Sequence, residues 1–232
     1  MQFLMRVAII PARGGSKRIP RKNIKPFAGL PIIAYSIKAA QASELFDRII
    51  VTTDDEEIAD VARSFGAEIP FIRPKELSDD HTATIPVIAH AIQTLQKQSV
   101  IDAACCIYAT APFIRAQDIV AAYNALITHN KHYAFPVTTF PFPIFRGVKR
   151  DDAGNIEMFW PEYFATRSQD LEEAYHDVGQ FYWGTPDAWL EGKPIFSEAA
   201  TTIVLPRHLV QDIDTPEDWH RAELMHKVLS LS

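Results

Sequence analysis

The segment with the clearest chemical character is a basic, glycine-containing loop near the N-terminus, PARGGSKRIPRKN at residues 11–23. Residues 13–25 include six Lys or Arg and no acidic residue, in a chain whose net charge is −6. The adjacent glycines let backbone N–H groups approach an anion closely. Arg13, Lys17 and Lys22 can neutralise a triphosphate and the charge that develops when it is cleaved. The loop predicts phosphate binding, although it matches neither the P-loop nor the dinucleotide fingerprint. The alternative is a solvated basic turn.

The second chemical signal is an acidic pair, Asp212 and Asp214, just before Thr215 and Pro216. Carboxylates two residues apart in an extended segment point to the same side, so both can reach one Mg²⁺, which prefers carboxylates and substrate phosphates. Alone, the pair fits equally well with exposed acids that precede a helix. Together with a triphosphate loop, it favours metal binding.

Several classes of protein are disfavoured by what the chain carries. The net charge of −6 opposes general binding to nucleic acid or to anionic membranes. No G-x-S-x-G, H-E-x-x-H or cysteine cluster is present, and Cys105 and Cys106 stand together in an apolar run that suits buried, reduced thiols. The longest apolar stretches are far shorter than the roughly 20 residues of a membrane span. Residues 1–7 lead into a strand without the features of a secretory signal, so we expect a cytoplasmic protein.

The elements that must position these residues alternate between strand and helix patterns. Strands are expected at 6–10, 48–53, 68–72, 103–108, 179–184 and 202–205. Helices are expected at 32–42 after Pro31, at 55–65 after an Asp54 cap, at 82–98, at 116–128, and from Pro216 to about residue 229 after a Thr215 cap. The basic loop follows the first strand, where open α/β sheets bind ligands. This order predicts one α/β domain over 1–232, with a mostly parallel sheet and helices on both faces.

Residues 133–170 interrupt the alternation. They are rich in Phe and Pro, and the turn signal at 151–155 can join two antiparallel strands. We therefore expect a small β-rich excursion from the core, which suits either an interface or a lid packed on its own subunit.

Three segments make the chain similar to the CMP-sialic acid synthetases over nearly its whole length: IPARGGSKRIPRKN at 10–23, RPKELSDDHTAT at 73–84 and DIDTPEDW at 212–219. The resemblance implies a Rossmann-like nucleotidyltransferase fold. It also implies a catalytic set of Lys22, Arg13 and Asp214, with Asp212 and Asp214 as ligands of Mg²⁺. The implied CTP site consists of Ala12, Arg13, Gly14, Gly15, Ser16, Lys17, Lys22, Asn23, Arg73 and Thr84.

The sugar side departs from enzymes for N-acetylneuraminic acid. Their Gln-Pro-Thr-Ser-Pro motif is YATAP here, at 108–112, and with HDVGQFYWG at 176–184 it looks closest to the branch that activates pseudaminic acid. In 180–183 one alternating pair could face a polar ligand while the other packs the core, or the strand could be wholly structural. The sugar contacts expected on this basis are Tyr108, Thr110, Arg167, Gln180 and Tyr182, with Arg167 binding the carboxylate.

The resemblance implies transfer of CMP from CTP to a nine-carbon acidic sugar, by in-line attack of the anomeric hydroxyl on the α-phosphorus and release of pyrophosphate. It also implies a homodimer whose excursion closes the partner's sugar site. N-acetylneuraminic and legionaminic acid remain alternative substrates, and a synthetase for an eight-carbon sugar is a more distant one. A binding or regulatory protein without turnover is the alternative from another class.

Overall fold

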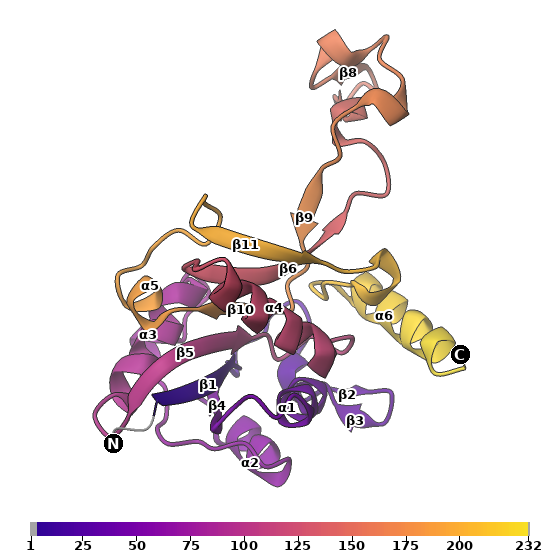
Figure 1. Ribbon diagram of the computed structural model, residues 1–232. Coiled ribbons are helices and arrows are strands. Elements are labelled where there is room, and N and C mark those ends of the chain that lie inside the picture. The colour runs from indigo at the N-terminus through magenta and orange to yellow at the C-terminus, as the bar shows by residue number, and fades with distance from the viewer. Residues whose placement is uncertain (1–3, 232) are drawn as a thin grey trace.

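Seven strands form the central sheet of the computed structural model, which describes residues 4–231 (Figure 1). In sheet order the strands are β11 (Ala200–Val204), β6 (Tyr133–Thr139), β10 (Phe181–Gly184), β5 (Val100–Ile107), β1 (Leu4–Pro11) and β4 (Arg48–Thr52), with β9 (Tyr175–Asp177) paired to β6. β9 and β10 run antiparallel to their neighbours, while β1, β4, β5, β6 and β11 share one direction. The sheet is thus mixed but mostly parallel.

Helices cover both faces of this sheet. On one face lie α1 (Ile33–Ala42), α2 (Glu56–Ser64) and α4 (Ala116–Thr128), and on the other lie α3 (Thr84–Leu95) and α5 (Pro186–Leu190). The strands alternate accordingly: in β1, Ala8 and Ile10 pack in the first core, while Val7 and Ile9 pack in the second. The expected fold class is confirmed. Among residues 4–231, no helix has the length and apolar character needed to cross a membrane.

A third apolar cluster ties the basic loop to the C-terminal helix. The short hairpin β2 (Pro26–Phe27) and β3 (Leu30–Pro31) packs against α6 (Pro216–Leu229), and Ile19 from the loop joins them. Phe27 meets Trp219 edge to face, with ring centroids 5.6 Å apart. Ile213, between the two aspartates, is fully buried in the same cluster. The loop and the acidic pair are therefore held together by one small core.

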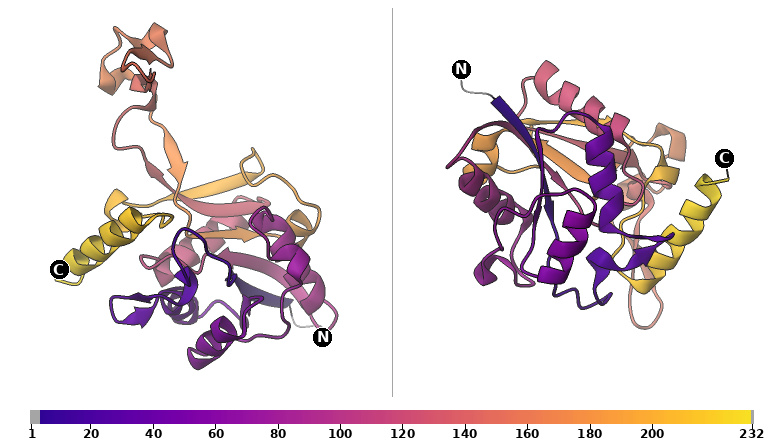
Figure 2. Two further views of the ribbon diagram at one scale, coloured as in Figure 1. Left: turned by 180° about the vertical axis from the view of Figure 1, so that it is seen from behind. Right: turned by 90° about the horizontal axis from the view of Figure 1, so that it is seen from below.

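The excursion is a protruding arm, hereafter the arm, that comprises residues 140–174 (Figures 1 and 2). Its tip is the hairpin of β7 (Val148–Arg150) and β8 (Ile156–Met158), joined by the turn expected at 151–155. The expected boundary of 133–170 is wrong, because residues 133–139 form β6 in the central sheet. Pro136 is tolerated there because β10 pairs only with the start of β6 and β9 only with its end, which leaves Pro136 without a partner on that side.

Other expected elements shift by a few residues. Residue 68 makes only an isolated bridge to Ile50 instead of starting a strand. The cap of α2 is Asp55 rather than Asp54, and Pro31 ends β3 rather than opening α1. The 116–128 helix and the capped α6 match the expectation, and α6 carries a full capping box between Thr215 and Asp218. Residues 1–3 and 232 of the expected domain lie outside the described residues. Short 3₁₀ turns complete the structure: η1 (Lys22–Ile24), η2 (Lys75–Leu77), η3 (Ile144–Arg146), η4 (Pro161–Tyr163), η5 (Ser168–Asp170) and η6 (Arg207–Leu209).

Candidate functional site

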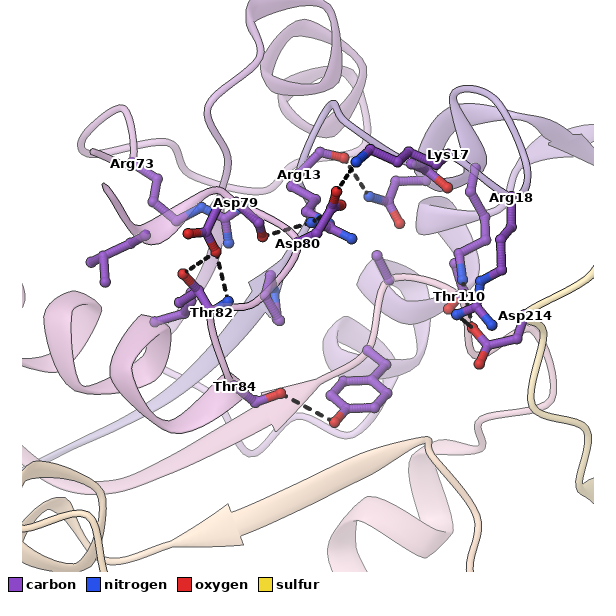
Figure 3. A pocket seen from close by; sticks show the side chains of 18 residues that line it. Arg13, Lys17, Arg18, Arg73, Asp79, Asp80, Thr82, Thr84, Thr110 and Asp214 are labelled. Carbon is purple, nitrogen blue, oxygen red and sulfur yellow. Dashed lines mark hydrogen bonds and ion pairs between the residues drawn. The ribbon is translucent and has the colours of Figure 1, made fainter. Parts of the chain in front are cut away.

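A cavity of about 600 Å³ opens at the carboxyl ends of β1 and β5, and we call it the first cavity (Figure 3). Three segments far apart in the sequence line it: the basic loop after β1, residues 73–87 before and within α3, and residues 108–110 after β5. Asp214, which precedes α6, closes a fourth side. This is the edge at which parallel α/β sheets bind ligands, because successive loops converge there.

The glycine turn of the loop rests on the acidic end of β4. The backbone N–H of Gly14 donates to Asp54 Oδ1 at 2.9 Å. A Cβ added at Gly14 would lie 2.6 Å from Asp55 Oδ2, so only glycine allows this approach. The Asp55 carboxylate also accepts hydrogen bonds from Nη1 and Nη2 of Arg21, at 2.5 and 2.9 Å. These bonds hold the pKa of Asp55 below its usual range. The loop is thereby clamped at both ends.

The cations of the first cavity are paired with two carboxylates. Arg13 contacts Asp80 Oδ1 at 2.7 Å, and Lys17 also contacts the Asp80 carboxylate. On the opposite side, Arg18 lies 2.9 Å from Asp214 Oδ1. Figure 3 shows these side chains converging from the loop. The Asp80 and Asp214 carboxylates thus lie among the cationic side chains, at positions that suit the oxygens of a bound phosphate chain.

Lys22 is the least exposed lysine of the loop. Its Nζ donates to the Ile213 carbonyl at 2.7 Å and lies 3.4 Å from Asp214 Oδ1. Asn23 holds the other side of the loop by donating to the Arg13 carbonyl at 2.9 Å. Lys22 therefore links the basic loop directly to the acidic pair, although 191 positions separate it from residue 213.

Arg73 carries an unsatisfied donor in the cavity wall. Its side chain is 3% exposed, and its Nη2 lies 3.7 Å from Asp54 Oδ1, too far for a hydrogen bond. Burial lowers the pKa of Arg73, although the Asp54 charge opposes this effect. The Arg73 Nε donates to Ser78 Oγ at 3.1 Å, so Nη2 is the nitrogen left without a hydrogen bond, and a buried donor in that state is costly unless a ligand satisfies it. Arg73 is therefore suited to bind an acceptor atom of a ligand in the first cavity.

Tyr108 and Thr84 form the floor of the first cavity (Figure 3). Their hydroxyl oxygens lie 3.3 Å apart, and burial raises the pKa of Tyr108 to about 12. The Tyr108 carbonyl accepts from Ser36 at 2.7 Å, and its N–H donates to the Gln180 carbonyl at 2.8 Å. Tyr108 thus presents a neutral hydroxyl from a rigidly held backbone.

Asp212 lines a different space from Asp214. It faces a second cavity of about 510 Å³ between the base of the arm and the start of α6. Burial, and then the neighbouring Asp214, raise the pKa of Asp212. Among residues 4–231, no cluster of three or more acidic, His or Cys side chains is arranged to hold a metal. Asp212 and Asp214, which are separated by Ile213, therefore line two different cavities.

The structure gathers most of the predicted site residues and leaves others outside. The first cavity is lined by Arg13, Ser16, Lys17, Lys22, Asn23, Arg73, Thr84, Tyr108, Thr110 and Asp214. Predicted residues that do not line it are Ala12, Gly14, Gly15, Arg167, Gln180, Tyr182 and Asp212. Ala12 is buried beneath the loop, and the two glycines shape the turn.

The expectation that Gln180 and Tyr182 face a ligand is corrected by the structure. Both side chains are buried, because β10 lies between β5 and β6 with helices on both faces. The Gln180 amide donates to the Leu209 carbonyl at 2.8 Å. Tyr182 packs against Tyr108, with ring centroids 5.7 Å apart. These two residues support the cavity floor instead of lining it.

The expectation for Arg167 is not met within a single chain. Arg167 lies on the arm, is 73% exposed and pairs with Asp170 at 2.7 Å. The arm projects away from the central sheet (Figure 1), and none of its residues lines the first cavity. Arg167 therefore does not reach the site of its own subunit.

Some site residues escaped the sequence-based selection. Arg18 pairs with Asp214, and Asp80 neutralises Arg13 and Lys17. Asp79 accepts from the Thr82 hydroxyl and backbone N–H at 2.7 Å and so shapes the loop that carries Asp80. The available signal was charge complementarity between the basic loop and the adjacent acids at 79–80.

The fold is that of the nucleotidyltransferases. The structure of CMP:2-keto-3-deoxy-manno-octonic acid synthetase complexed with CTP superposes with a TM-score of 0.70 at 16% sequence identity. The match covers 97% of this chain and 99% of that one. The two chains therefore follow the same path over nearly their whole lengths.

The chain belongs to the cytidylyltransferase family, whose model matches residues 7–142. It is 47% identical to a pseudaminic acid cytidylyltransferase of Campylobacter jejuni, over 96% of each chain. It is 34% identical to a CMP-N,N'-diacetyllegionaminic acid synthase of Legionella pneumophila, over 94% of each chain.

Proposed function

We propose that this protein transfers CMP from CTP to pseudaminic acid and releases pyrophosphate. The observation that carries the proposal is 47% identity, over 96% of both chains, to a relative with that activity in its name. The first cavity supports the same reaction, because its cations and the buried Arg73, whose Nη2 lacks a hydrogen-bond partner, suit a nucleoside triphosphate.

The side chains divide the work between binding and charge stabilisation. Arg13 and Lys17 exchange Asp80 for the β- and γ-phosphates of CTP, and Arg73 accommodates the cytidine side. Lys22 stands between the loop and Asp214, where it offsets charge at the phosphate under attack. The anomeric hydroxyl of the sugar attacks the α-phosphorus in line, and pyrophosphate leaves toward the cationic loop. No covalent intermediate with the protein is needed.

Asp212 and Asp214 fit a role as ligands of Mg²⁺. They offer hard oxygen donors, and burial, followed by the charge of Asp214, raises the pKa of Asp212, so a bound cation would stabilise its ionised form. Mg²⁺ commonly takes one or two protein carboxylates and completes its shell with substrate phosphates and water. When bound, the ion would polarise phosphate oxygens and acidify the attacking hydroxyl.

The proposal includes a homodimer in which the arm reaches the partner. The arm exposes several large apolar side chains, among them Phe142 at 79% and Phe164 at 74%. Apolar groups gathered on a protruding segment are typical of an interaction surface. In such a dimer Arg167 would act in the partner's sugar site. The proposal also includes a cytoplasmic location, because the reaction consumes CTP.

The test is pyrophosphate release from CTP and Mg²⁺ with pseudaminic, legionaminic or N-acetylneuraminic acid supplied separately, and without sugar as the control. We expect turnover with pseudaminic acid well above that with the other two acids. Preference for another acid would keep the reaction and replace the substrate. Binding of CTP without turnover of any acid would favour the binding-protein alternative.

A further inference from the structure

Arg21 adopts a left-handed backbone conformation within the basic loop, with φ 56° and ψ 29°. This region favours glycine, because the Cβ of an L-residue approaches the following carbonyl oxygen. Among residues 4–231, the other non-glycine residues with positive φ lie just after α1 or α4 or in the turn of the β2–β3 hairpin, and they are Glu44, Asn130 and Ala28. Arg21 alone directly precedes a residue of the first cavity. A strained residue persists only where its surroundings hold it, and such residues concentrate at functional sites.

The Arg21 side chain anchors this turn to the start of α2. Its Nη1 and Nη2 donate to the Asp55 carboxylate at 2.5 and 2.9 Å, and Nη2 also contacts the Glu57 carboxylate. Asp55 is itself fixed, because it caps α2 by accepting the Ile58 N–H at 3.0 Å. A planar guanidinium that meets a carboxylate through two nitrogens is held in direction as well as in distance. Arg21 is thus bound to α2 and does not line the first cavity.

The backbone of Arg21 starts the turn that carries Lys22. The Arg21 carbonyl accepts the N–H groups of Ile24 and Lys25, each at 3.0 Å, and Lys22 is the first residue of η1. The Lys22 side chain reaches the segment before α6, where its Nζ donates to the Ile213 carbonyl at 2.7 Å. Consecutive side chains therefore connect the starts of two helices. Because a change of φ at Arg21 would rotate the residues that follow, the direction of Lys22 depends on the left-handed turn.

We propose that Arg21 is a positioning residue for Lys22, because its anchors on α2 stabilise the turn that directs the Lys22 ammonium into the first cavity. This inference rests on the proposed function, in which Lys22 offsets charge at the phosphate under attack. A cation stabilises that charge most when it is already in place and need not reorganise during the reaction. Arg21 thus contributes to turnover without touching either substrate.

The test compares Arg21→Ala, Arg21→Gly and Arg21→Lys with the parent protein, using CTP, Mg²⁺ and pseudaminic acid. Arg21→Ala loses the anchors and keeps a Cβ that disfavours the turn, so kcat should fall about tenfold and KM for CTP should rise about threefold. Arg21→Gly loses the same anchors but adopts positive φ readily, so it should retain more turnover than Arg21→Ala. Arg21→Lys should recover part of the loss, because an ammonium can still pair with Asp55. Kinetics of Arg21→Ala equal to those of the parent would overturn the inference.

A double-mutant cycle with Lys22→Ala separates positioning from general stability. If Arg21 acts through Lys22, Arg21→Ala should change kcat/KM for CTP by less than about twofold in the Lys22→Ala background. Arg48→Ala is the matched control, because Arg48 on β4 donates from two nitrogens to Glu68 and lines neither cavity. It loses a comparable ion pair, and kcat should stay within about twofold of the parent value. An additive cycle, or an equal loss of kcat in Arg48→Ala, would contradict the positioning role.

Calorimetric titration of inorganic triphosphate, which needs neither cytosine nor sugar, tests the inference separately from the proposed function. Affinity should fall about threefold in Arg21→Ala and at least as much in Lys22→Ala, with no further loss in the double variant. Should the parent bind triphosphate but turn over no acid, the proposed function fails and this titration decides the inference. Equal affinity of the parent and Arg21→Ala, or no binding by the parent, would refute it.

Discussion

Replacing Gly14 by alanine tests how the phosphate loop is held. The new Cβ would lie 2.6 Å from Asp55 Oδ2 and 3.1 Å from its Cβ, so one of the two segments must move. Asp55 cannot turn away at little cost, since it caps α2 through the Ile58 N–H at 3.0 Å and pairs with Arg21. In Gly14→Ala, the phosphate loop and the start of α2 therefore cannot both keep their positions.

The cost follows from the two interactions that must give way. Loss of the N-cap is worth roughly 1 kcal/mol. Loosening the partly exposed pair of Arg21 and Asp55 adds about 0.5 kcal/mol. A total of roughly 1.5 kcal/mol lowers Tm by about 3–6 °C in a domain of this size. Displacement of the loop should also lower kcat/KM for CTP by about 10- to 100-fold, because its cations no longer meet the phosphates in register.

Two comparisons make this prediction specific. Gly15→Ala serves as the stability control, because an added Cβ there meets nothing within 4 Å and Tm should not fall. Asp55→Ser keeps a good cap with a shorter side chain, so Gly14→Ala should cost less stability in that background. Calorimetric unfolding and CTP kinetics provide the readouts. Equal Tm values for the two alanine variants would refute the steric reasoning, as would an additive double mutant.

Three further predictions concern chemistry, protonation and assembly. Asp214→Asn should reduce turnover at least about 100-fold with an unchanged circular dichroism spectrum; a near-normal rate with Mg²⁺ would remove Asp214 from the mechanism. Tyr108, whose pKa burial raises to about 12, should stabilise the fold fully below pH 10 and lose that contribution between about pH 10 and 12, since the unfolded chain releases this proton first. The difference in tyrosinate absorbance between the parent and Tyr108→Phe measures the pKa of Tyr108, and titration of this residue near pH 10 would contradict the prediction. Phe142→Ser combined with Phe164→Ser should weaken self-association in sedimentation equilibrium, and an unchanged dimer would exclude the exposed arm as the interface.

Elements with local signals were predictable from the sequence. The helix at 116–128 and the capped α6 match their expected bounds, because apolar periodicity and the Thr215-Pro216 start signal are encoded within a few residues. The strand expected at 68–72 fails for the opposite reason. Only residue 68 bridges to Ile50, and whether an apolar stretch joins a ladder depends on where the edge strand β4 ends.

The boundary of the arm shows how nonlocal packing misleads. Residues 133–139 are rich in aromatic residues and contain Pro136, which disfavours a central strand. The tertiary fold removes the conflict, because β9 and β10 pair with different ends of β6 and Pro136 lies between them. No periodicity in the segment itself reveals that arrangement.

The site follows the same division between local and nonlocal information. Glycines and cations concentrated in one loop identify Arg13, Lys17 and Lys22, and the cavity gathers all three. Alternation along residues 180–183 suggested that Tyr182 faces a ligand. The alternation is correct, but β10 is buried on both faces, so the Tyr182 side chain is buried as well.

The short span from Asp212 to Asp214 unites these features because its central residue is fixed. Ile213 is fully buried with Phe27 and Trp219, and its carbonyl receives Lys22. The next backbone N–H groups are held by Asp218, so the segment is rigid from the hydrophobic cluster into α6. The basic loop, in contrast, is held at Asp80 and Asp214 by partly exposed ion pairs that contribute little and exchange easily. A nucleotide entering the first cavity can therefore displace the loop contacts without moving the carboxylates. The position of the acidic pair therefore depends on the packing of α6 as much as on the loop.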